Sequence, residues 1–194
     1  MSQADYGKEA TLAISSEGTL REAPPNANPT LYVLLLRQDD PRKCTAAKLA
    51  RFGFAKPLFR IRQIPRKAIV LNPSASRTLR SEDNAVAERN GLIAVDCSWE
   101  KVQKVFAIRM PGEGRRLPTL LASNPVNYAK PDKLSSLEAL TAALYIIGFK
   151  ERAVQLLGLF KWGKTFLTLN SEPLEAYATA VTTNDMEEVE AQFF

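Results

Sequence analysis

The sequence predicts an α/β fold with a mostly parallel sheet, followed by an all-helical carboxy-terminal half. Three short apolar runs predict the strands, at Leu31–Leu36, Ala68–Leu71 and Leu92–Val95. Uninterrupted runs of this length are typical of strands covered on both faces. Helical stretches lie between them, and after Pro131 the apolar spacing becomes helical and stays so. Alternating strands and helices indicate βαβ units and a parallel sheet.

The first part of the chain is expected to hold the α/β domain. Residues 1–29 are polar and contain several prolines, which predicts a flexible extension. A helix is expected over Thr45–Phe52, ended by the glycine that follows it. A further helix is expected over Trp99–Ala107, with the preceding serine as its N-cap. The α/β domain is therefore predicted to span residues 30–118.

The second part, residues 119–194, is predicted to be a helical domain. Ser135 and Glu138 form a capping box, S-x-x-E, which starts a helix that Gly148 ends. The helices expected after it span Lys150–Phe160, Lys161–Leu169, a segment capped by Ser171 with Pro173 in its first turn, and Met186–Phe193.

Composition excludes several classes of enzyme. The chain has no histidine, so it is no Ser-His-Asp or Cys-His hydrolase and no HExxH metalloenzyme. Cys44 and Cys97 are far apart and form no CxxC pair, so we expect buried reduced thiols and no metal. Any chemistry must use carboxylates, backbone groups or a substrate that carries its own driving force.

The net charge of +5 and a pI near 9.3 suit a nucleic-acid partner, although solvated surface charge would have the same composition. No apolar run approaches the roughly 18 residues that a membrane span needs, so we expect a cytoplasmic protein without a membrane partner. The candidate RNA-binding residues are Arg60, Arg62, Arg66 and Lys67, then Arg115 and Arg116, then Lys130 with Lys133 nearby.

The expected site lies beyond the carboxyl ends of the strands, where α/β sheets bind ligands. The segments Arg37–Thr45 and Asp96–Trp99 follow the first and third predicted strands. We therefore expect them to lie side by side and to form the site.

Four segments together carry a family resemblance. They resemble, in order and spacing, the small-subunit (16S/18S) rRNA aminocarboxypropyltransferases of archaea and eukaryotes, over about residues 30–180. That resemblance implies a SPOUT-like sheet with a trefoil knot. The segments are RQDDPRKCTAAKL (Arg37–Leu49), GLIAVDCSWE (Gly91–Glu100), RLPTLLASNPVNYAKP (Arg116–Pro131) and KLSSLEALTAALYIIGF (Lys133–Phe149).

The resemblance also implies an activity. Members use S-adenosylmethionine as co-substrate and transfer its 3-amino-3-carboxypropyl group to the position-3 nitrogen of a pseudouridine, usually methylated at position 1, in small-subunit rRNA. The partner would be this rRNA or the pre-ribosomal small subunit, during ribosome biogenesis. A SPOUT-type RNA methyltransferase and a non-catalytic rRNA-binding assembly protein remain alternatives. We expect a monomer, because the helical half would cover the surface through which knotted enzymes pair.

Site residues follow from the same resemblance. Asp96 is the candidate catalytic residue, with a helix cap as its alternative role. Thr45 is expected to bind the cofactor carboxylate, or only to cap a helix. Trp99 is expected to pack on the cofactor's side chain or sulfonium, or only in the core. The ribose and adenine pocket would be lined by Val95, Leu117, Asp132 and Ser136.

The sequence departs from the family pattern at three positions. Ala46 and Ala129 stand where glycine is common, and Asp132 stands where an aromatic residue is common. An alanine would be strained wherever the backbone needs a positive φ. These departures affect the expected shape of the pocket.

Overall fold

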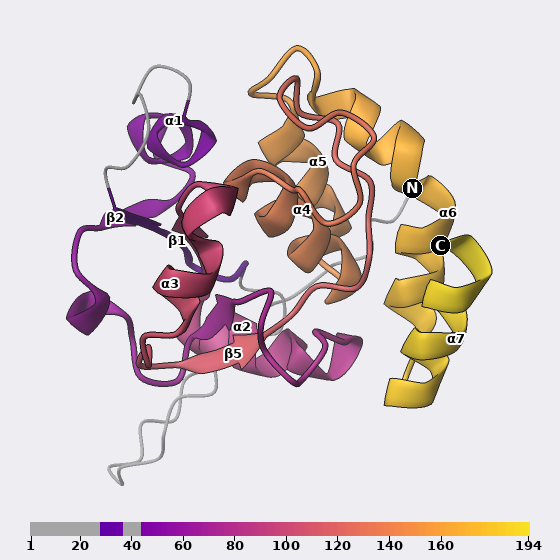
Figure 1. Ribbon diagram of the computed structural model, residues 1–194, viewed down its shortest axis with the longest axis horizontal. Helices are drawn as coiled ribbons and strands as arrows, with labels where there is room; N and C mark the ends of the chain where they lie inside the picture. Colours follow the sequence, from indigo (N-terminus) through magenta and orange to yellow (C-terminus); the bar gives the residue numbers. More distant parts are fainter. Residues whose placement is uncertain (1–27, 37–43) are drawn as a thin grey trace, which may run out of the picture.

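The protein is an α/β structure in which helices pack on a parallel sheet (Figure 1). The computed structural model describes residues 28–36 and 44–194. The predicted extension over residues 1–29 lies almost entirely outside these ranges, as do residues 37–43 of the predicted site. None of the helices in the described ranges has the length and apolar character needed to cross a membrane.

Within the described residues the sheet has five strands, all paired in parallel, in the order β2-β1-β4-β3-β5. The three predicted strands are confirmed to within a residue at either end, and they form the centre of the sheet as β1, β4 and β3. The strands are β1 (Leu31–Leu35), β2 (Lys56–Leu58), β3 (Ile69–Leu71), β4 (Leu92–Asp96) and β5 (Glu113–Arg115).

The two edge strands, β2 and β5, were not predicted. Their sequences, KPL and EGR, contain proline, glycine and charge in place of an apolar run. An edge strand bonds to one neighbour and keeps one side open, so it tolerates such residues and leaves little pattern in the sequence.

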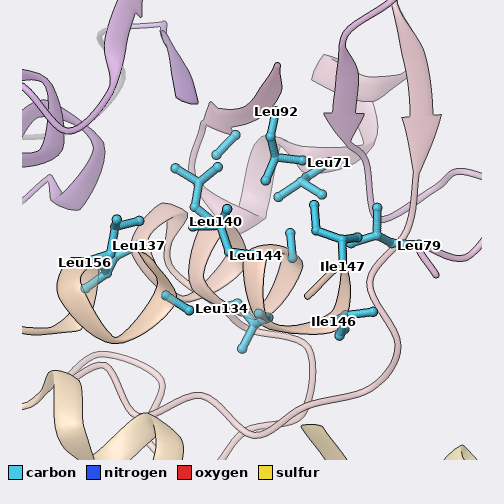
Figure 2. Close-up of a cluster of buried hydrophobic side chains, with 14 of the residues drawn as sticks. Leu71, Leu79, Leu92, Leu134, Leu137, Leu140, Leu144, Ile146, Ile147 and Leu156 are labelled. Carbon is cyan, nitrogen blue, oxygen red and sulfur yellow. The ribbon is translucent and has the colours of Figure 1, made fainter. Parts of the chain in front are cut away.

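Alternate residues of the central strands face two separate apolar layers. Leu31, Leu71 and Leu92 belong to the larger one, which α4 (Ser136–Ile146) completes with Leu140 and other residues (Figure 2). The opposite face of the sheet carries Leu34, Val70 and Ile93, packed against the segment around Ile64. Because α4 packs on the sheet, the predicted α/β and helical segments share one core.

Two of the helices in the first half follow the prediction. Helix α1 spans Thr45–Arg51, and Gly53 follows its C-cap with a φ of +74° that is easy only for glycine. The predicted helix from Trp99 is split into a 3₁₀ turn, Trp99–Lys101, and α3, Val102–Phe106. Helix α2, Asn84–Asn90, was missed, because the sequence NAVAERN carries no clear apolar stripe.

The helical half matches the prediction closely. Its capping box holds, because Ser135 Oγ accepts from the Glu138 N–H and a Glu138 carboxylate oxygen accepts from the Ser135 N–H. The two helices expected on either side of Asn170 are merged into α6, which is kinked at that residue. Pro173 lacks a backbone donor, which favours such a kink. Helices α5, α6 and α7 span Lys150–Leu157, Gly163–Thr179 and Thr183–Phe193.

Candidate functional site

A cavity of about 1270 Å³ opens at the carboxyl edge of the sheet. Its walls are the segments that follow β3, β4 and β5, together with the starts of α1 and α4. Parallel strands all end at this edge, which is why segments far apart in the sequence meet there. The cavity is lined by all seven residues predicted to be catalytic or cofactor-binding: Thr45, Val95, Asp96, Trp99, Leu117, Asp132 and Ser136.

Asp96 ends β4, and its carboxylate meets the start of α1. The Cys44 thiol donates a hydrogen bond to Asp96 Oδ2, at 3.1 Å between Sγ and oxygen. Burial raises the pKa of Cys44 to about 12, and the nearby Asp96 carboxylate adds to the rise. The thiol is therefore neutral at physiological pH and acts as a donor. The N-cap positions of the turn and the helix that follow belong to Ser98 and Lys101.

Trp99 is held on the cavity wall by contacts at two points of its indole. Its Nε1 donates to the carbonyl of Leu134 at 3.3 Å, and Lys133 Nζ lies 4.6 Å from the ring centroid. The position of the Lys133 ammonium shows that the face of the Trp99 ring accommodates a positive charge here. The side chain lies partly exposed in the cavity and outside the two buried apolar layers.

The starts of α1 and α4 meet at the cavity. The Leu137 N–H donates to Thr45 Oγ1, with 3.4 Å between nitrogen and oxygen. Thr45 is not the cap of α1, since that position belongs to Cys44, whose Sγ accepts from the Ala47 N–H at 3.2 Å. The Thr45 hydroxyl oxygen therefore links the starts of the two helices at the cavity wall.

The wall formed after β5 carries a group of opposite charges. Arg116 pairs with Glu190 of α7 at 3.3 Å, and the Thr119 N–H donates to the same carboxylate at 2.8 Å. Desolvation raises the pKa of Asp132, and the nearby charge of Glu190 contributes to the rise. Tyr177 of α6 is fully buried and donates to the carbonyl of Thr119 at 3.2 Å, which ties the helices to this wall.

Residues 122–130 form a loop at the cavity, called here the 122–130 loop. Glu138, fully buried, accepts hydrogen bonds from the backbone N–H groups of Ser123 and Asn124 and from both of their side chains. The sequence predicted Glu138 only as a capping residue. Its second role has no local signal, because the capping box is complete without the loop.

Two non-glycine residues near the cavity have a positive φ, Ala129 and Asp132, both at +59°. Both were singled out as departures from the family pattern. Left-handed backbone costs an L-residue roughly 1–2 kcal/mol. The strain expected for alanine is therefore present at Ala129, whereas Ala46 lies inside α1 with ordinary helical geometry.

The predicted RNA-binding residues differ in their exposure. Arg115 is a correction: it is 3% exposed and its guanidinium pairs with the buried Asp83 at 2.9 Å, so it is not available to a phosphate. Arg116 lines the cavity and Lys130 is exposed on the 122–130 loop. Four exposed residues lie outside the cavity lining: Arg60, Arg62, Arg66 and Lys67.

Several cavity residues were missed by the sequence analysis. Lys48 of α1 donates to the carbonyl of Leu159 at 2.8 Å, and its Nζ lies 3.9 Å from the ring centroid of Phe160. Trp162 follows on the same wall, with its ring centroid 5.3 Å from that of Phe160. More than one hundred residues separate this wall from Lys48, so no spacing rule predicts the contact.

Comparison with known proteins identifies this arrangement. Residues 69–194 match the family described as "Ribosome biogenesis protein, C-terminal". The 16S rRNA aminocarboxypropyltransferase of Methanosarcina mazei is 45% identical over 165 residues, which cover 84% of this chain and 94% of the relative. The enzyme of that name from Methanopyrus kandleri is 45% identical, covering 84% and 97%. The chain belongs to the 16S rRNA aminocarboxypropyltransferase family.

A solved structure of the family supports the fold. The SAM-dependent rRNA:acp-transferase Tsr3 from Vulcanisaeta distributa aligns with a TM-score of 0.77 and 40% identity, over 85% of this chain and 97% of that one. The family resemblance stated from the sequence is confirmed, and with it the prediction that the chain is an enzyme. The mixed α/β architecture is confirmed as well. The knot stays a prediction.

A second match concerns the start of the described chain. Residues 29–61 match a family described as a possible Fer4-like domain in RNase L inhibitor. Iron–sulfur clusters of that kind are held by four cysteine thiolates. The matched segment contains one cysteine, Cys44, and the whole chain contains two. The residues present therefore do not fit a four-cysteine cluster.

Proposed function

We propose that this enzyme transfers the 3-amino-3-carboxypropyl group of S-adenosylmethionine to the position-3 nitrogen of a pseudouridine, methylated at position 1, in small-subunit rRNA. The observation that carries the proposal is the convergence of Thr45, Asp96 and Trp99 on one cavity. These three residues come from two segments that lie far apart in the sequence. The family relatives bear the name of this transferase.

The size and lining of the cavity suit two reactants. Small-molecule sites commonly measure about 300–1,000 Å³. At about 1270 Å³ this cavity has room for a nucleoside cofactor and for an acceptor base beside it. Its wall combines apolar residues such as Leu117 and Leu134 with polar residues such as Asn124, which suits a ligand with an adenine, a ribose and a charged arm.

The residues divide the work of binding. Thr45 and the first backbone N–H groups of α1 would hold the carboxylate of the amino acid arm. Val95, Leu117, Asp132 and Ser136 would line the nucleoside pocket. Trp99 would present an aromatic face to positive charge, as it already does to Lys133. Holding the γ-carbon of the arm, and not the methyl carbon, toward the acceptor would decide which group is transferred.

The reaction needs one proton to be removed. Sulfonium supplies a good leaving group when the co-substrate is bound, so positioning provides much of the acceleration. Asp96 would accept the proton from the acceptor nitrogen or orient the base. The Cys44 hydrogen bond fixes the direction of that carboxylate. A histidine is not required in this scheme, which agrees with a chain that has none.

The same proposal includes the wider context of the enzyme. Its partner would be small-subunit rRNA or the pre-ribosomal small subunit, bound through exposed basic residues including Lys130, during ribosome biogenesis in the cytoplasm. We expect a monomer, because α6 and α7 pack beside the sheet wall that follows β5. A SPOUT-type trefoil knot in the backbone belongs to the proposal too.

Labelled co-substrate tests the proposed reaction. Small-subunit rRNA from cells that lack the protein is incubated with enzyme and S-adenosylmethionine labelled either in the methyl group or in the carboxyl group. We expect carboxyl label in the RNA and, by mass spectrometry, a single modified pseudouridine. Methyl label in the RNA would identify a methyltransferase instead. No label, with no saturable S-adenosylmethionine binding by calorimetry, would identify a non-catalytic assembly protein.

A further inference from the structure

The 122–130 loop carries two large side chains that the rest of the fold does not cover. Val126 is 81% exposed and Tyr128 is 58% exposed. Val126 also lines the cavity, which places this loop at the cavity mouth. Two residues of chain span at most about 7 Å, so Tyr128 lies close to the same opening. An aromatic residue exposed to this extent beside a ligand cavity needs an explanation.

The loop is fixed in shape although it lies at the surface. Its two ends are joined by hydrogen bonds from the Ala122 N–H to the Lys130 carbonyl, 3.1 Å, and from the Ala129 N–H to the Ala122 carbonyl, 2.7 Å. A turn in its second half is closed by a bond from the Lys130 N–H to the Asn127 carbonyl, 2.9 Å. The first half of the loop is held by buried Glu138, which accepts hydrogen bonds from the Ser123 and Asn124 N–H groups. A preorganised backbone loses little conformational entropy when the loop binds a ligand.

We propose that Tyr128 forms a stacking platform for an unpaired base of the RNA substrate, next to the nucleotide that enters the cavity. This inference rests on the proposed function, because it assigns the neighbouring nucleotide of the same substrate. Exposed aromatic rings beside basic residues bind single-stranded RNA by stacking. Lys130, two residues after Tyr128 and exposed, supplies a charge for the adjoining phosphate.

The chemistry of the loop favours RNA over a protein as the occupant. Lys130 is exposed on the loop itself, and the exposed Lys101 lines the same cavity as Val126, so this part of the opening offers positive charge to a polyanion. Ala129 keeps a left-handed backbone at an energetic cost, and such strain persists where the surrounding structure enforces one shape. A loop of fixed shape that carries an exposed ring and a lysine suits a base together with its phosphate.

The test compares two RNA probes and three variants. Fluorescein-labelled octauridylate and a fully paired RNA duplex are titrated with wild type, Tyr128→Ala, Tyr128→Phe and Lys130→Ala, and binding is followed by fluorescence anisotropy over a range of salt. Phe194→Ala, which removes an exposed aromatic ring at the residue that follows α7, outside the lining of the large cavity, is the control. Because Tyr128 is exposed, the variants are expected to fold, and their S-adenosylmethionine affinity by calorimetry checks this.

We expect Tyr128→Ala to bind octauridylate about tenfold more weakly, with the duplex unaffected. Tyr128→Phe should bind as wild type does, because it keeps the ring. Tyr128→Ala should leave the slope of log affinity against log salt unchanged, whereas Lys130→Ala should reduce that slope by about one phosphate contact. Unchanged octauridylate affinity in Tyr128→Ala, or an equal loss on the duplex, would overturn the inference.

The two proposals fail separately. If wild type transfers no label to rRNA and Tyr128→Ala still weakens octauridylate binding, the proposed reaction is wrong and the stacking platform stands. If wild type modifies rRNA and Tyr128→Ala does so equally well at limiting RNA, the reaction stands and the platform is wrong.

Discussion

Cys44 and Asp96, which are 52 positions apart in the chain, are joined by a hydrogen bond of 3.1 Å between the thiol sulfur and a carboxylate oxygen. The bond connects the start of α1 with the end of β4, the two segments that the sequence placed at the site. It holds the candidate catalytic carboxylate by means of a donor that stays protonated. Much of what can be tested about the site follows from this contact.

Asp96→Asn tests the proposed proton acceptor. The amide keeps the size of the side chain but is not basic, so turnover should fall by about 100-fold or more. Affinity for S-adenosylmethionine should change little, because the carboxylate acts on the RNA base. Single-turnover transfer of carboxyl label, with calorimetry beside it, measures the two effects. Wild-type turnover in Asp96→Asn would remove Asp96 from the mechanism.

Cys44 should be unusually slow to alkylate. Only the thiolate reacts, and with a pKa raised to about 12 its thiolate fraction at pH 8 is on the order of one in ten thousand. Carboxamidomethylation by iodoacetamide should therefore accelerate about tenfold per pH unit between about pH 7 and 9.5, without levelling off. Peptide mapping separates Cys44 from Cys97.

The Asp96→Asn variant supplies the matched control for this measurement. Removing the carboxylate charge removes one cause of the raised Cys44 pKa, so alkylation should be faster at each pH. A rate that levels off below about pH 9, as it does for an ordinary cysteine, would contradict the assignment of a neutral donor.

Trp99→Ala should weaken S-adenosylmethionine binding by roughly tenfold, because an aromatic face near a positive charge contributes about 0.5–2 kcal/mol. Trp99→Phe keeps a ring but loses the hydrogen bond to Leu134, so it separates stacking from positioning. Calorimetry measures both. If Trp99→Ala binds as wild type does, the residue serves packing alone.

Glu138→Gln should destabilise the fold by about 2 kcal/mol. The carboxylate is fully buried and accepts bonds from Ser123, Asn124 and Ser135, and an amide nitrogen in place of one oxygen would face donors. Urea unfolding measures the loss, with the exposed Glu172→Gln as control. Equal stability of the two variants would mean that the bonds to the loop contribute little.

Ala129→Gly should stabilise the protein by about 0.5–1 kcal/mol. Glycine removes the cost of the left-handed backbone at φ +59°, and this gain is partly offset by its greater freedom in the unfolded chain. Ala46→Gly, inside α1, should instead destabilise by about 1 kcal/mol. Urea unfolding of both variants tests the contrast. Destabilisation by Ala129→Gly would show that the strain is not there.

Local patterns predicted the parts of the fold that local energetics decide. The central strands came from apolar runs, and the capping box of Ser135 and Glu138 marked the start of α4 correctly. The sequence predicted a break between two helices next to Asn170, and the structure has a kink there within α6. Edge strand β2, with sequence KPL, was missed, because one-sided pairing imposes no periodic pattern.

The site was predicted in part for a different reason. Resemblance to a family supplied Thr45, Asp96 and Trp99, and the cavity brings them together. The prediction made from charge alone failed for Arg115, since a sequence shows that a residue is charged but not that Asp83 lies buried beside it. Neither the charge pattern nor the resemblance indicated that Phe160 and Trp162 line the cavity.

By itself the sequence determined the central strands, the capping box of α4, the absence of histidine chemistry and the family. Only the tertiary structure decided which residues meet: Cys44 with Asp96, Glu138 with the 122–130 loop, and Arg115 with Asp83. The physical reason is the range of the forces involved. Turns, caps and apolar periodicity act within a few residues, whereas these contacts depend on the order in which parallel strands assemble, which no local pattern records.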